Sequence, residues 1–309
     1  MASLRGRDFT AIRDLETDEV QDLLNFAADL KARRRAGDRP PLLAGKILAV
    51  VFEKPSLRTR ATFEAAMLEL GGHAIYLGAQ DIHMGVRESQ ADVARNLERW
   101  VDGIAARTFA HATITILAEH TRVPVVNALS DWEHPCQALA TLLTVQERWG
   151  RLSGLRLAWV GDGNNVLRSL LLGAVRLGIS VAIATPDGYG LDAETLRAAR
   201  ELAAAAGAGV EVTDDPVQAV TGADLIYTDI WASMGREAEA DVRRQAFARY
   251  QVNQALLAHA PRYALVSHCL PAHRGEEITD DILDGPRSLA LEEAENRLHT
   301  QKALLAQVL

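Results

Sequence analysis

The chain has 309 residues, of which 48% are hydrophobic and 24% charged, and its formal net charge at pH 7 is −8. This length suits two domains of about 150 residues each, and the acidic balance argues against nucleic acid as a partner, because phosphate backbones recruit broad basic surfaces. Two distant cysteines, and no apolar run near the roughly 18 residues that span a bilayer, predict a protein of the cytoplasm that does not associate with membranes.

Apolar periodicity in the first half of the chain predicts alternating helices and strands. An amphipathic helix begins near Thr17, the expected N-cap, and ends in the basic stretch 33–35. A buried strand over 47–52 leads into a helix that ends at Gly71 and Gly72. Further strands are expected over 73–77, 103–107 and 123–126, with a helix that starts near Ser89. Such alternation is typical of a parallel sheet with helices on its faces.

The second half of the chain repeats this alternation. A long helix over 134–149 precedes strand-like segments at 155–160, 181–185, 225–227 and 263–266, and the segment 197–206 is an alanine-rich helix. The last helix, near 289–308, has no strand after it, so we expect it to pack back on the N-terminal domain. The predicted fold class is therefore α/β with two domains, each a parallel sheet flanked by helices. The domains cover 1–135 with the C-terminal helix 288–309, and 150–287, and the helix 136–149 connects them.

Two groups of polar residues follow strands of the first half. Ser56, Leu57, Arg58 and Thr59 lie where a strand gives way to a helix, and the unpaired N–H groups and positive dipole of a helix start suit a phosphate. An ordinary N-cap with surface arginines explains the same residues. Arg107 ends the strand 103–107, where a guanidinium can enter the crevice at the carboxyl edge of a parallel sheet. A surface ion pair is the alternative for Arg107.

Two polar residues lie at the start of the long central helix. Pro135 suits a first helical turn, and His134 and Gln137 lie three residues apart on one helix face. A histidine at a helix start is usually a cap or a buried hydrogen-bonding group. Two polar side chains on one face of an otherwise apolar helix start are harder to explain in that way, which favours a binding role.

The second domain has polar motifs after its strands too. The turn 161–165 resembles a dinucleotide-binding loop only weakly, since Val166 stands where the third glycine would be. The amide of Asn165 at a helix start suits a carboxylate ligand or a cap. Asp229, followed by Ser233 and Met234, is typical of a binding loop, although an acid after a strand also forms turns.

A cysteine follows the last predicted strand. Cys269 is flanked by His268, His273 and Arg274. Cysteine is most often a small buried hydrophobic residue, but a thiol in cationic surroundings has a lowered pKa and can exchange protons or hydrogen bonds with a reacting amine.

Together and in this order, these segments resemble the aspartate/ornithine carbamoyltransferase family over nearly the whole chain. His-Pro-Cys-Gln and the strand-end arginine go with carbamoyl phosphate binding, whereas Asp-x-x-x-Ser-Met-Gly and His-Cys-Leu-Pro are typical of the ornithine branch. The resemblance implies that the first domain binds carbamoyl phosphate, that the second binds ornithine, and that the products are citrulline and phosphate. It implies carbamoyl phosphate contacts from Ser56, Leu57, Arg58, Thr59, His83, Arg107, His134, Gln137, Cys269, Leu270 and Arg297. It implies ornithine contacts from Asn165, Asp229, Ser233 and Met234.

The resemblance also implies the mechanism. Arg107 and His134 would stabilise the carbonyl oxygen of carbamoyl phosphate, and Asp229 and Cys269 would orient the neutral δ-amine, so that these four residues form the catalytic set. No metal or organic cofactor is expected. Family members are trimers or multiples of trimers, so a homotrimer is expected here.

Two positions depart from the family pattern. Leu57 stands where many members have threonine, which removes a hydroxyl but keeps the backbone N–H, so phosphate binding should survive. His83 stands where we expect a glutamine that reaches the phosphate in a neighbouring subunit, and this places that contact in question.

Three alternatives compete with ornithine carbamoylation. A carbamoyltransferase for putrescine or an N-acylated ornithine is opposed by the segments 233–235 and 269–271. A nicotinamide-dependent dehydrogenase would explain two α/β halves, but not the residues 56–59 and 134–137. A non-catalytic binding protein is disfavoured because every matched polar residue is present.

Overall fold

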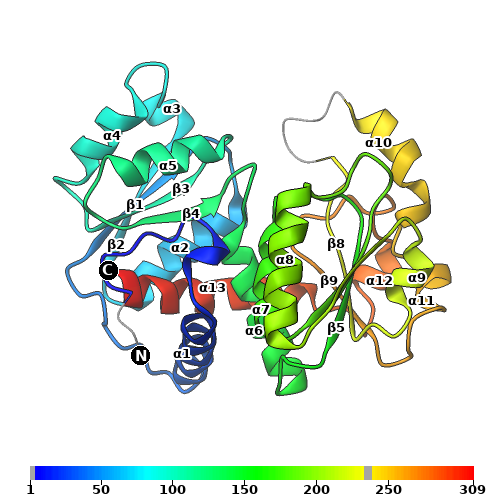
Figure 1. The fold of residues 1–309 in the computed structure, drawn as a ribbon. Helices are drawn as coiled ribbons and strands as arrows, with labels where there is room; N and C mark the ends of the chain where they lie inside the picture. The colour runs from blue at the N-terminus through cyan, green and yellow to red at the C-terminus, as the bar shows by residue number, and fades with distance from the viewer. Residues whose placement is uncertain (1–3, 233–238) are drawn as a thin grey trace. The chain divides into compact units, whose positions relative to one another are not determined.

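The computed structural model describes residues 4–232 and 239–309. It divides into two compact units, of which unit 1 is Met1–Leu143 with Glu295–Leu309 and unit 2 is Thr144–Ala294. Each unit contains one parallel sheet (Figure 1). Within the described ranges, no helix is long and apolar enough to cross a membrane.

Unit 1 is built on a four-stranded parallel sheet in the order β2-β1-β3-β4. Its strands are β1 (Ile47–Phe52), β2 (His73–Gly78), β3 (Gly103–Arg107) and β4 (Val125–Leu129). Its helices are η1 (Ile12–Asp14), α1 (Thr17–Arg35), α2 (Leu57–Glu69), α3 (Ala79–Ile82), α4 (Gln90–Leu97), α5 (His111–Glu119) and the first part of α6 (Pro135–Trp149).

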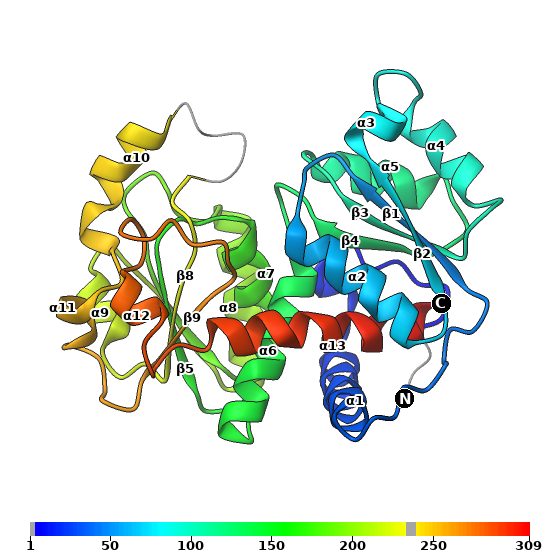
Figure 2. The ribbon, with the colours of Figure 1, turned by 180° about the vertical axis from the view of Figure 1, so that it is seen from behind.

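The order of the strands in unit 1 reverses between β1 and β3. From β1 the chain moves outward to β2, and it then crosses to β3 and continues outward to β4 on the other side. Right-handed crossovers in opposite directions place their helices on opposite faces of the sheet. Accordingly, α4 and α5 cover one face and α2 lies on the other, as both ribbon views show (Figures 1 and 2).

The C-terminal helix α13 (Ala290–Val308) packs on unit 1 from Glu295 onward, which confirms the predicted return to the N-terminal domain. The Lys302 ammonium donates to Glu69 of α2 at 2.9 Å. The N–H of Gly6 donates to the Val308 carbonyl at 2.8 Å. Leu309 lies so close to Gly103 of β3 that any side chain at Gly103 would collide with it.

Unit 2 is built on a five-stranded parallel sheet in the order β7-β6-β5-β8-β9. Its strands are β5 (Arg156–Val160), β6 (Ser180–Ala184), β7 (Val210–Thr213), β8 (Leu225–Thr228) and β9 (Leu265–His268). Its helices are α7 (Asn165–Arg176), α8 (Ala193–Ala206), α9 (Pro216–Val220), α10 (Ala240–Phe247), η3 (Ala248–Tyr250), α11 (Gln254–Leu257) and α12 (Asp280–Leu283).

The strand order in unit 2 also reverses, here between β5 and β8. The chain moves outward through β6 and β7, with α7 and α8 packed side by side, and then crosses to β8 and β9. Helices α9 to α12 therefore cover the opposite face, where a second apolar core includes Val160, Ile226, Phe247 and Val266. The predicted α/β class, with a helix-flanked parallel sheet in each unit, is confirmed.

Several details differ from the sequence prediction. Strand β4 occupies 125–129 where 123–126 was predicted, and strand β9 occupies 265–268 where 263–266 was predicted. The N-cap of α1 is Glu16, not Thr17. The Glu16 N–H donates to the Glu19 carboxylate at 2.9 Å, and the helix therefore starts with Thr17 as its first helical residue. Strand β7 was not predicted. It is a four-residue strand at the sheet edge and is only partly buried, so it lacks the apolar run that reveals the central strands.

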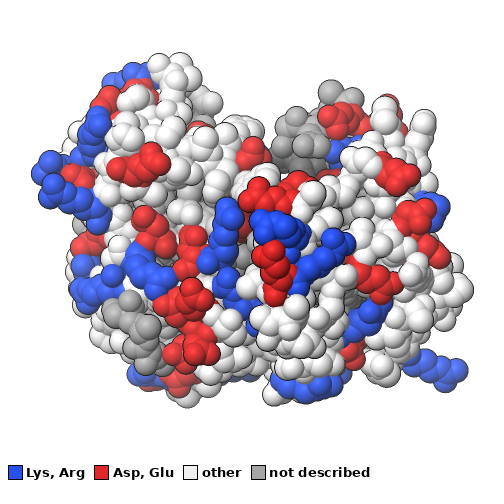
Figure 3. Space-filling model, viewed as in Figure 1, with Lys and Arg blue, Asp and Glu red and all other residues white. Residues whose placement is uncertain are grey.

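Charges of both signs are interspersed on the face of the molecule that Figure 3 shows. Ion pairs between exposed side chains include Arg197 with Glu201 and Arg60 with Glu64.

A buried group of basic side chains lies where α13 packs in unit 1. His299 of α13 is fully buried, and burial together with the charges of Lys31, Lys302 and Arg34 lowers its pKa to about 4. The Glu295 carboxylate, 3.8 Å from His299 Nε2, opposes this shift only in part. His299 is therefore neutral at pH 7, and a proton on its ring would add charge to a site that already holds buried cations.

We predict that His299→Gln reduces the loss of stability in acid. Because the folded pKa of His299 is about 4, the unfolded chain takes up a proton as the pH falls through about 6.5 while the folded chain does not, so stability declines between these values. This term is worth up to roughly 3 kcal/mol, and glutamine, which does not titrate, removes it. Urea unfolding at pH 7.5 and pH 4.5 measures the difference.

The exposed His259 provides the matched control. His259→Gln should lose stability between the two pH values as the wild type does. An equal acid-induced loss in wild type and His299→Gln would show that His299 does not contribute to the pH dependence.

Candidate functional site

The start of α2 brings together the four residues 56–59. Ser56 is the N-cap, in an extended conformation, and its hydroxyl accepts from the Thr59 N–H at 3.3 Å. Leu57 opens the helix with a side chain that is 81% exposed, whereas Thr59 is fully buried. The first turn of a helix carries unpaired N–H groups and the positive end of its dipole, so this position suits an anion.

Two arginines distant in sequence converge on the Thr59 hydroxyl. Arg107 lies 3.3 Å from Thr59 Oγ1 and Arg297 lies 2.9 Å from it, and both guanidinium groups are more than nine-tenths buried. Arg107 comes to Thr59 because β1 and β3 are neighbours and Arg107 pairs with Phe52 at the end of β1. Arg297 comes from the C-terminal helix. The sequence did not indicate that Thr59 would orient both.

His134 is buried close to these arginines, and Gln137 is buried as well. Burial lowers the pKa of His134 well below its usual value, and the charges of Arg297, Arg107 and Arg58 lower it further. The ring is therefore neutral at pH 7 and can donate a hydrogen bond without carrying charge. Three guanidinium groups and a neutral imidazole close together form a site in unit 1 for a small anionic ligand with polar oxygens.

Unit 2 brings together an amide and a carboxylate at its own reversal point. Asn164 caps α7, accepting from the N–H groups of Val166 and Leu167 at 3.0 and 3.1 Å. Its amide donates to Asp229 Oδ2 at 2.7 Å. Strand β5 leads to Asn164 and strand β8 leads to Asp229, and these strands are adjacent. The partly exposed Asn165 is the first residue of α7.

Cys269 completes this cluster in unit 2. Its thiol donates to Asp229 Oδ1 at 2.9 Å, so that Asn164 and Cys269 each bond one oxygen of the same carboxylate. Arg274, one of the cations expected near this thiol, pairs instead with Asp280, the first residue of α12, and with Asp284, the C-cap of α12, at 2.7 and 2.6 Å.

The residues after Cys269 form a constrained loop. Leu270 has a φ of 56°, in the left-handed region, and the Leu270–Pro271 peptide bond is cis. The Leu270 N–H donates to Nδ1 of His268 at 2.8 Å, and His268 Nε2 lies 3.1 Å from the buried Glu277. Neither His268 nor Glu277 was assigned a role from the sequence. The signal available was that His268 is the first residue of the His-Cys-Leu-Pro motif and that Glu277 follows this motif closely in the sequence.

Two clusters have the donor types of a metal site. The possible ligand atoms of Asp229, His268 and Cys269 all lie within 4.8 Å of one another, as do those of His273, Glu276 and Glu277. In the first cluster the Cys269 thiol and both ring nitrogens of His268 already hydrogen-bond to protein groups. A metal ion would have to displace these bonds.

One predicted site residue within the described ranges, His83, is not joined to either group of site residues. His83 follows α3 in a left-handed conformation, with φ 47°, and is exposed. Ser233 and Met234 lie outside the described residues. The other predicted residues fall into one group in each unit, with Arg297 in unit 1 and Leu270 in unit 2.

Comparison with known proteins identifies two family models along the chain. Residues 7–147 match the carbamoyl-P binding domain of aspartate/ornithine carbamoyltransferase, and residues 153–308 match its Asp/Orn binding domain. An ornithine carbamoyltransferase from Pyrococcus horikoshii is 50% identical over 309 residues, which are 100% of this chain and 98% of that protein.

Solved structures show the same likeness. Ornithine carbamoyltransferase from Pyrococcus furiosus matches with a TM-score of 0.97 and 49% identity, covering 100% of this chain and 98% of that one. An N-acetyl-L-ornithine transcarbamylase variant matches with a TM-score of 0.90, covering 98% and 100% of the two chains, but its identity is only 32%.

Proposed function

The chain belongs to the aspartate/ornithine carbamoyltransferase family, and from this premise we propose that it transfers the carbamoyl group of carbamoyl phosphate to L-ornithine, giving L-citrulline and phosphate. The observation that carries this proposal is the 50% identity to a protein named ornithine carbamoyltransferase along the whole chain. The 32% identity to an N-acetyl-L-ornithine transcarbamylase supports the ornithine branch over the acylated one. A relative named anabolic, 49% identical over 309 residues, supports a role in arginine biosynthesis.

Unit 1 is the proposed carbamoyl phosphate-binding domain. Its start of α2 offers helix N–H groups to the phosphate, and Arg58 adds a guanidinium fork. Arg107, which hydrogen-bonds to the Thr59 hydroxyl, is proposed to bridge the phosphate and the carbonyl oxygen. The residues of unit 1 proposed to bind this substrate are Ser56, Leu57, Arg58, Thr59, Arg107, His134, Gln137 and Arg297.

His134 has a defined role in this proposal. Because its pKa is lowered well below the usual value, it acts as a neutral hydrogen-bond donor to the carbonyl oxygen, not as a proton source. When the amine attacks, negative charge grows on that oxygen. Fixed donors such as Arg107 and His134 stabilise the charge without having to reorganise, which is the usual source of catalysis in acyl transfer.

Unit 2 is the proposed ornithine-binding domain. Asp229 is proposed to pair with the α-amino group and Asn165 to donate to the α-carboxylate, with Ser233 and Met234 as further contacts. Asn164 supports this role of Asp229 by bonding one of its oxygens at 2.7 Å. Cys269 and Leu270 are proposed to contact carbamoyl phosphate, and Cys269 with Asp229 to orient the reacting amine.

The reaction then requires alignment and little else. A free amine has a pKa of about 10, so the neutral δ-amine is a minor form at pH 7 that the site must select. Its nitrogen forms a bond to the carbamoyl carbon, the bond from that carbon to the phosphate oxygen breaks, and the proton that the amine loses passes to the departing phosphate. Carbamoyl phosphate is already activated, so positioning supplies most of what the protein contributes.

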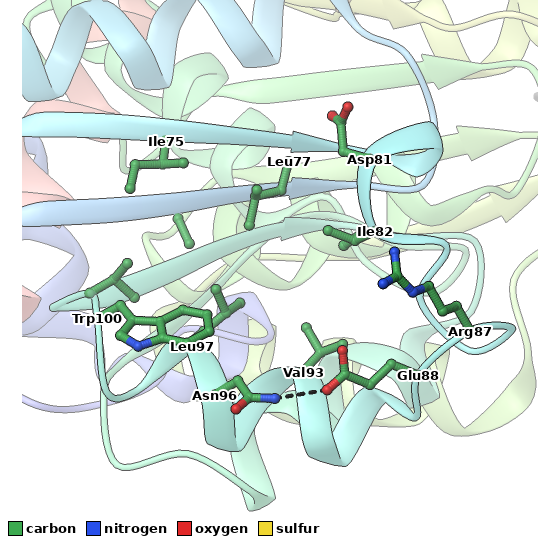
Figure 4. A pocket seen from close by; sticks show the side chains of 12 residues that line it. Ile75, Leu77, Asp81, Ile82, Arg87, Glu88, Val93, Asn96, Leu97 and Trp100 are labelled. Atoms are coloured by element: carbon green, nitrogen blue, oxygen red, sulfur yellow. Dashed lines mark hydrogen bonds between the residues drawn. The ribbon is translucent and has the colours of Figure 1, made fainter.

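We propose further that the protein is a cytoplasmic homotrimer or a multiple of trimers. Unit 1 has an apolar groove of about 290 Å³ beside its edge strand β2, lined by Ile75, Leu77, Leu97 and Trp100 among others (Figure 4). Ile75 and Trp100 are 45% and 65% exposed, and apolar surface of this kind is typical of protein contacts.

His83 follows Ile82, which also lines the groove, and this supports a contact of His83 with a neighbouring copy. A mass in solution of one or two chains would contradict the trimer.

A citrulline assay tests the activity itself. Purified protein with carbamoyl phosphate should form citrulline with L-ornithine. The kcat/KM for putrescine and for N-acetyl-L-ornithine should be at least tenfold lower, which corresponds to about 1.4 kcal/mol less transition-state stabilisation. A higher kcat/KM for either of the other amines would mean that this amine, and not ornithine, is the substrate. No carbamoylation of any of the three would refute the proposed function.

Arg107→Lys should lower kcat/KM for carbamoyl phosphate by about a hundredfold or more while the fold persists. An ammonium is a compact point charge and does not reproduce the planar fork that reaches Thr59 and an oxyanion together. Steady-state kinetics and the thermal midpoint measure the two effects. Arg60→Lys, which changes a surface arginine paired with Glu64, is the control, and near wild-type turnover in Arg107→Lys would remove Arg107 from the site.

Asn165→Ala should reduce activity with ornithine more than activity with putrescine. Putrescine has the reacting amine but no carboxylate, so only ornithine loses the hydrogen bond that the Asn165 amide donates to its α-carboxylate. A hydrogen bond to a charged group is worth roughly 1.5–3 kcal/mol. This corresponds to about ten- to a hundredfold in kcat/KM. Equal losses with both amines would mean that Asn165 does not bind the carboxylate.

A further inference from the structure

A buried carboxylate closes the loop that follows β9. Glu277 is fully buried, and its Oε1 accepts from the backbone N–H of His273 at 2.6 Å and lies 3.1 Å from Nε2 of His268. His268 and His273 are the two ends of the segment 268–273, which we call the 268–273 loop. One carboxylate oxygen therefore ties both ends of this loop together, with Cys269 and Leu270 held between them.

The hydrogen bonds of His268 determine where its proton lies. Nδ1 is 2.8 Å from the N–H of Leu270, and an N–H donor requires a lone pair on the ring nitrogen that accepts it. Nδ1 is therefore bare, and the proton is on Nε2, where it points to Glu277. A carboxylate that fixes the tautomer of a histidine in this way also fixes the orientation of its ring.

The group at the end of this chain of bonds is the backbone of Leu270. With a φ of 56°, Leu270 occupies the left-handed region, which a leucine seldom adopts without support from its surroundings. The bond from its N–H to His268 supplies such support directly. Leu270 and Cys269 are also the two residues of unit 2 proposed to contact carbamoyl phosphate.

We propose that Glu277 and His268 are positioning residues for carbamoyl transfer, acting as a relay from carboxylate to imidazole to the Leu270 amide that holds Leu270 and Cys269 in their reactive geometry. This inference rests on the proposed function. Neither residue contacts substrate in this scheme. The relay explains why a carboxylate and an imidazole are buried together next to the 268–273 loop, although a pair of apolar side chains could fill the same space.

Two isosteric variants of His268 separate the two bonds of the relay. In His268→Asn the side-chain oxygen lies near the place of Nδ1 and still accepts from Leu270, but the link to Glu277 is lost. In His268→Gln the terminal amide lies near the place of Nε2 and still donates to Glu277, but Leu270 loses its acceptor. His259→Gln, at an exposed histidine of the same unit, is the matched control and should behave as the wild type does.

We expect His268→Gln to lower kcat by about ten- to a hundredfold relative to His268→Asn, because only the former leaves the Leu270 N–H without a partner. The inhibition constant of inorganic phosphate should change less than about threefold, since the residues proposed to bind the phosphate group itself are on unit 1. A merely structural role would lower the thermal midpoint and kcat together in both variants. Equal kcat values in the two variants would overturn the proposal.

The wild-type protein provides a second test that does not depend on the folding of a variant. Ser267–His268 is the only Ser–His pair in the chain, so ¹³C-serine and ¹⁵N-histidine labels identify His268 by NMR. Its ¹⁵N shifts at pH 7.5 should show a bare Nδ1 and a protonated Nε2. A protonated Nδ1 would overturn the relay.

These outcomes are distinct from failure of the proposed function. If the wild type forms no citrulline, the ornithine carbamoyltransferase proposal fails, whatever the tautomer of His268. If the wild type forms citrulline but the two His268 variants have equal kcat, the relay alone fails.

Discussion

The reversal of strand order in each sheet is the constraint on which the candidate sites depend. Where neighbouring parallel strands send their connections to opposite faces, their carboxyl ends are left open to a ligand. In unit 1 this point lies between β1 and β3, and it brings Thr59 to Arg107. In unit 2 it lies between β5 and β8, and it brings Asn164 to Asp229. The same topological feature thus brings together a different group of polar residues in each unit.

Buried charge distinguishes the two groups of residues. In unit 1, Arg58, Arg107 and Arg297 lie close enough to His134 to lower its pKa, which concentrates positive charge around a neutral imidazole. In unit 2, a carboxylate is held by an amide and a thiol. The first arrangement suits a dianionic phosphate and a developing oxyanion, and the second suits an ammonium group. The chemical difference between carbamoyl phosphate and ornithine matches the difference between the two units.

The sequence predicted the central strands closely and the edge strands unevenly: β2 was predicted correctly, β4 and β9 were predicted two residues too early, and β7 was missed. Strand β3 was predicted at the residues it occupies because an apolar run buried on both faces is visible in the sequence, whereas the partly exposed β7 has no such run. The residues of the strand-end motifs do lie at strand ends, and their roles in binding stay predictions. Nothing in the sequence indicates that Arg107 and Arg297 share the Thr59 hydroxyl, since 48 and 238 residues separate them from Thr59.

The α/β class, the residue types at each strand end and the family can be read from the amino-acid sequence, because these depend on local periodicity and on motifs of a few residues. The orientation of those residues and the protonation state in which they act follow from the fold. The neutrality of His134, the carboxylate bond of the Cys269 thiol and the relay from Glu277 to Leu270 all depend on burial and on partners far away in the chain. Such properties arise when packing removes water and brings distant charges together, and no local stretch of sequence contains that information.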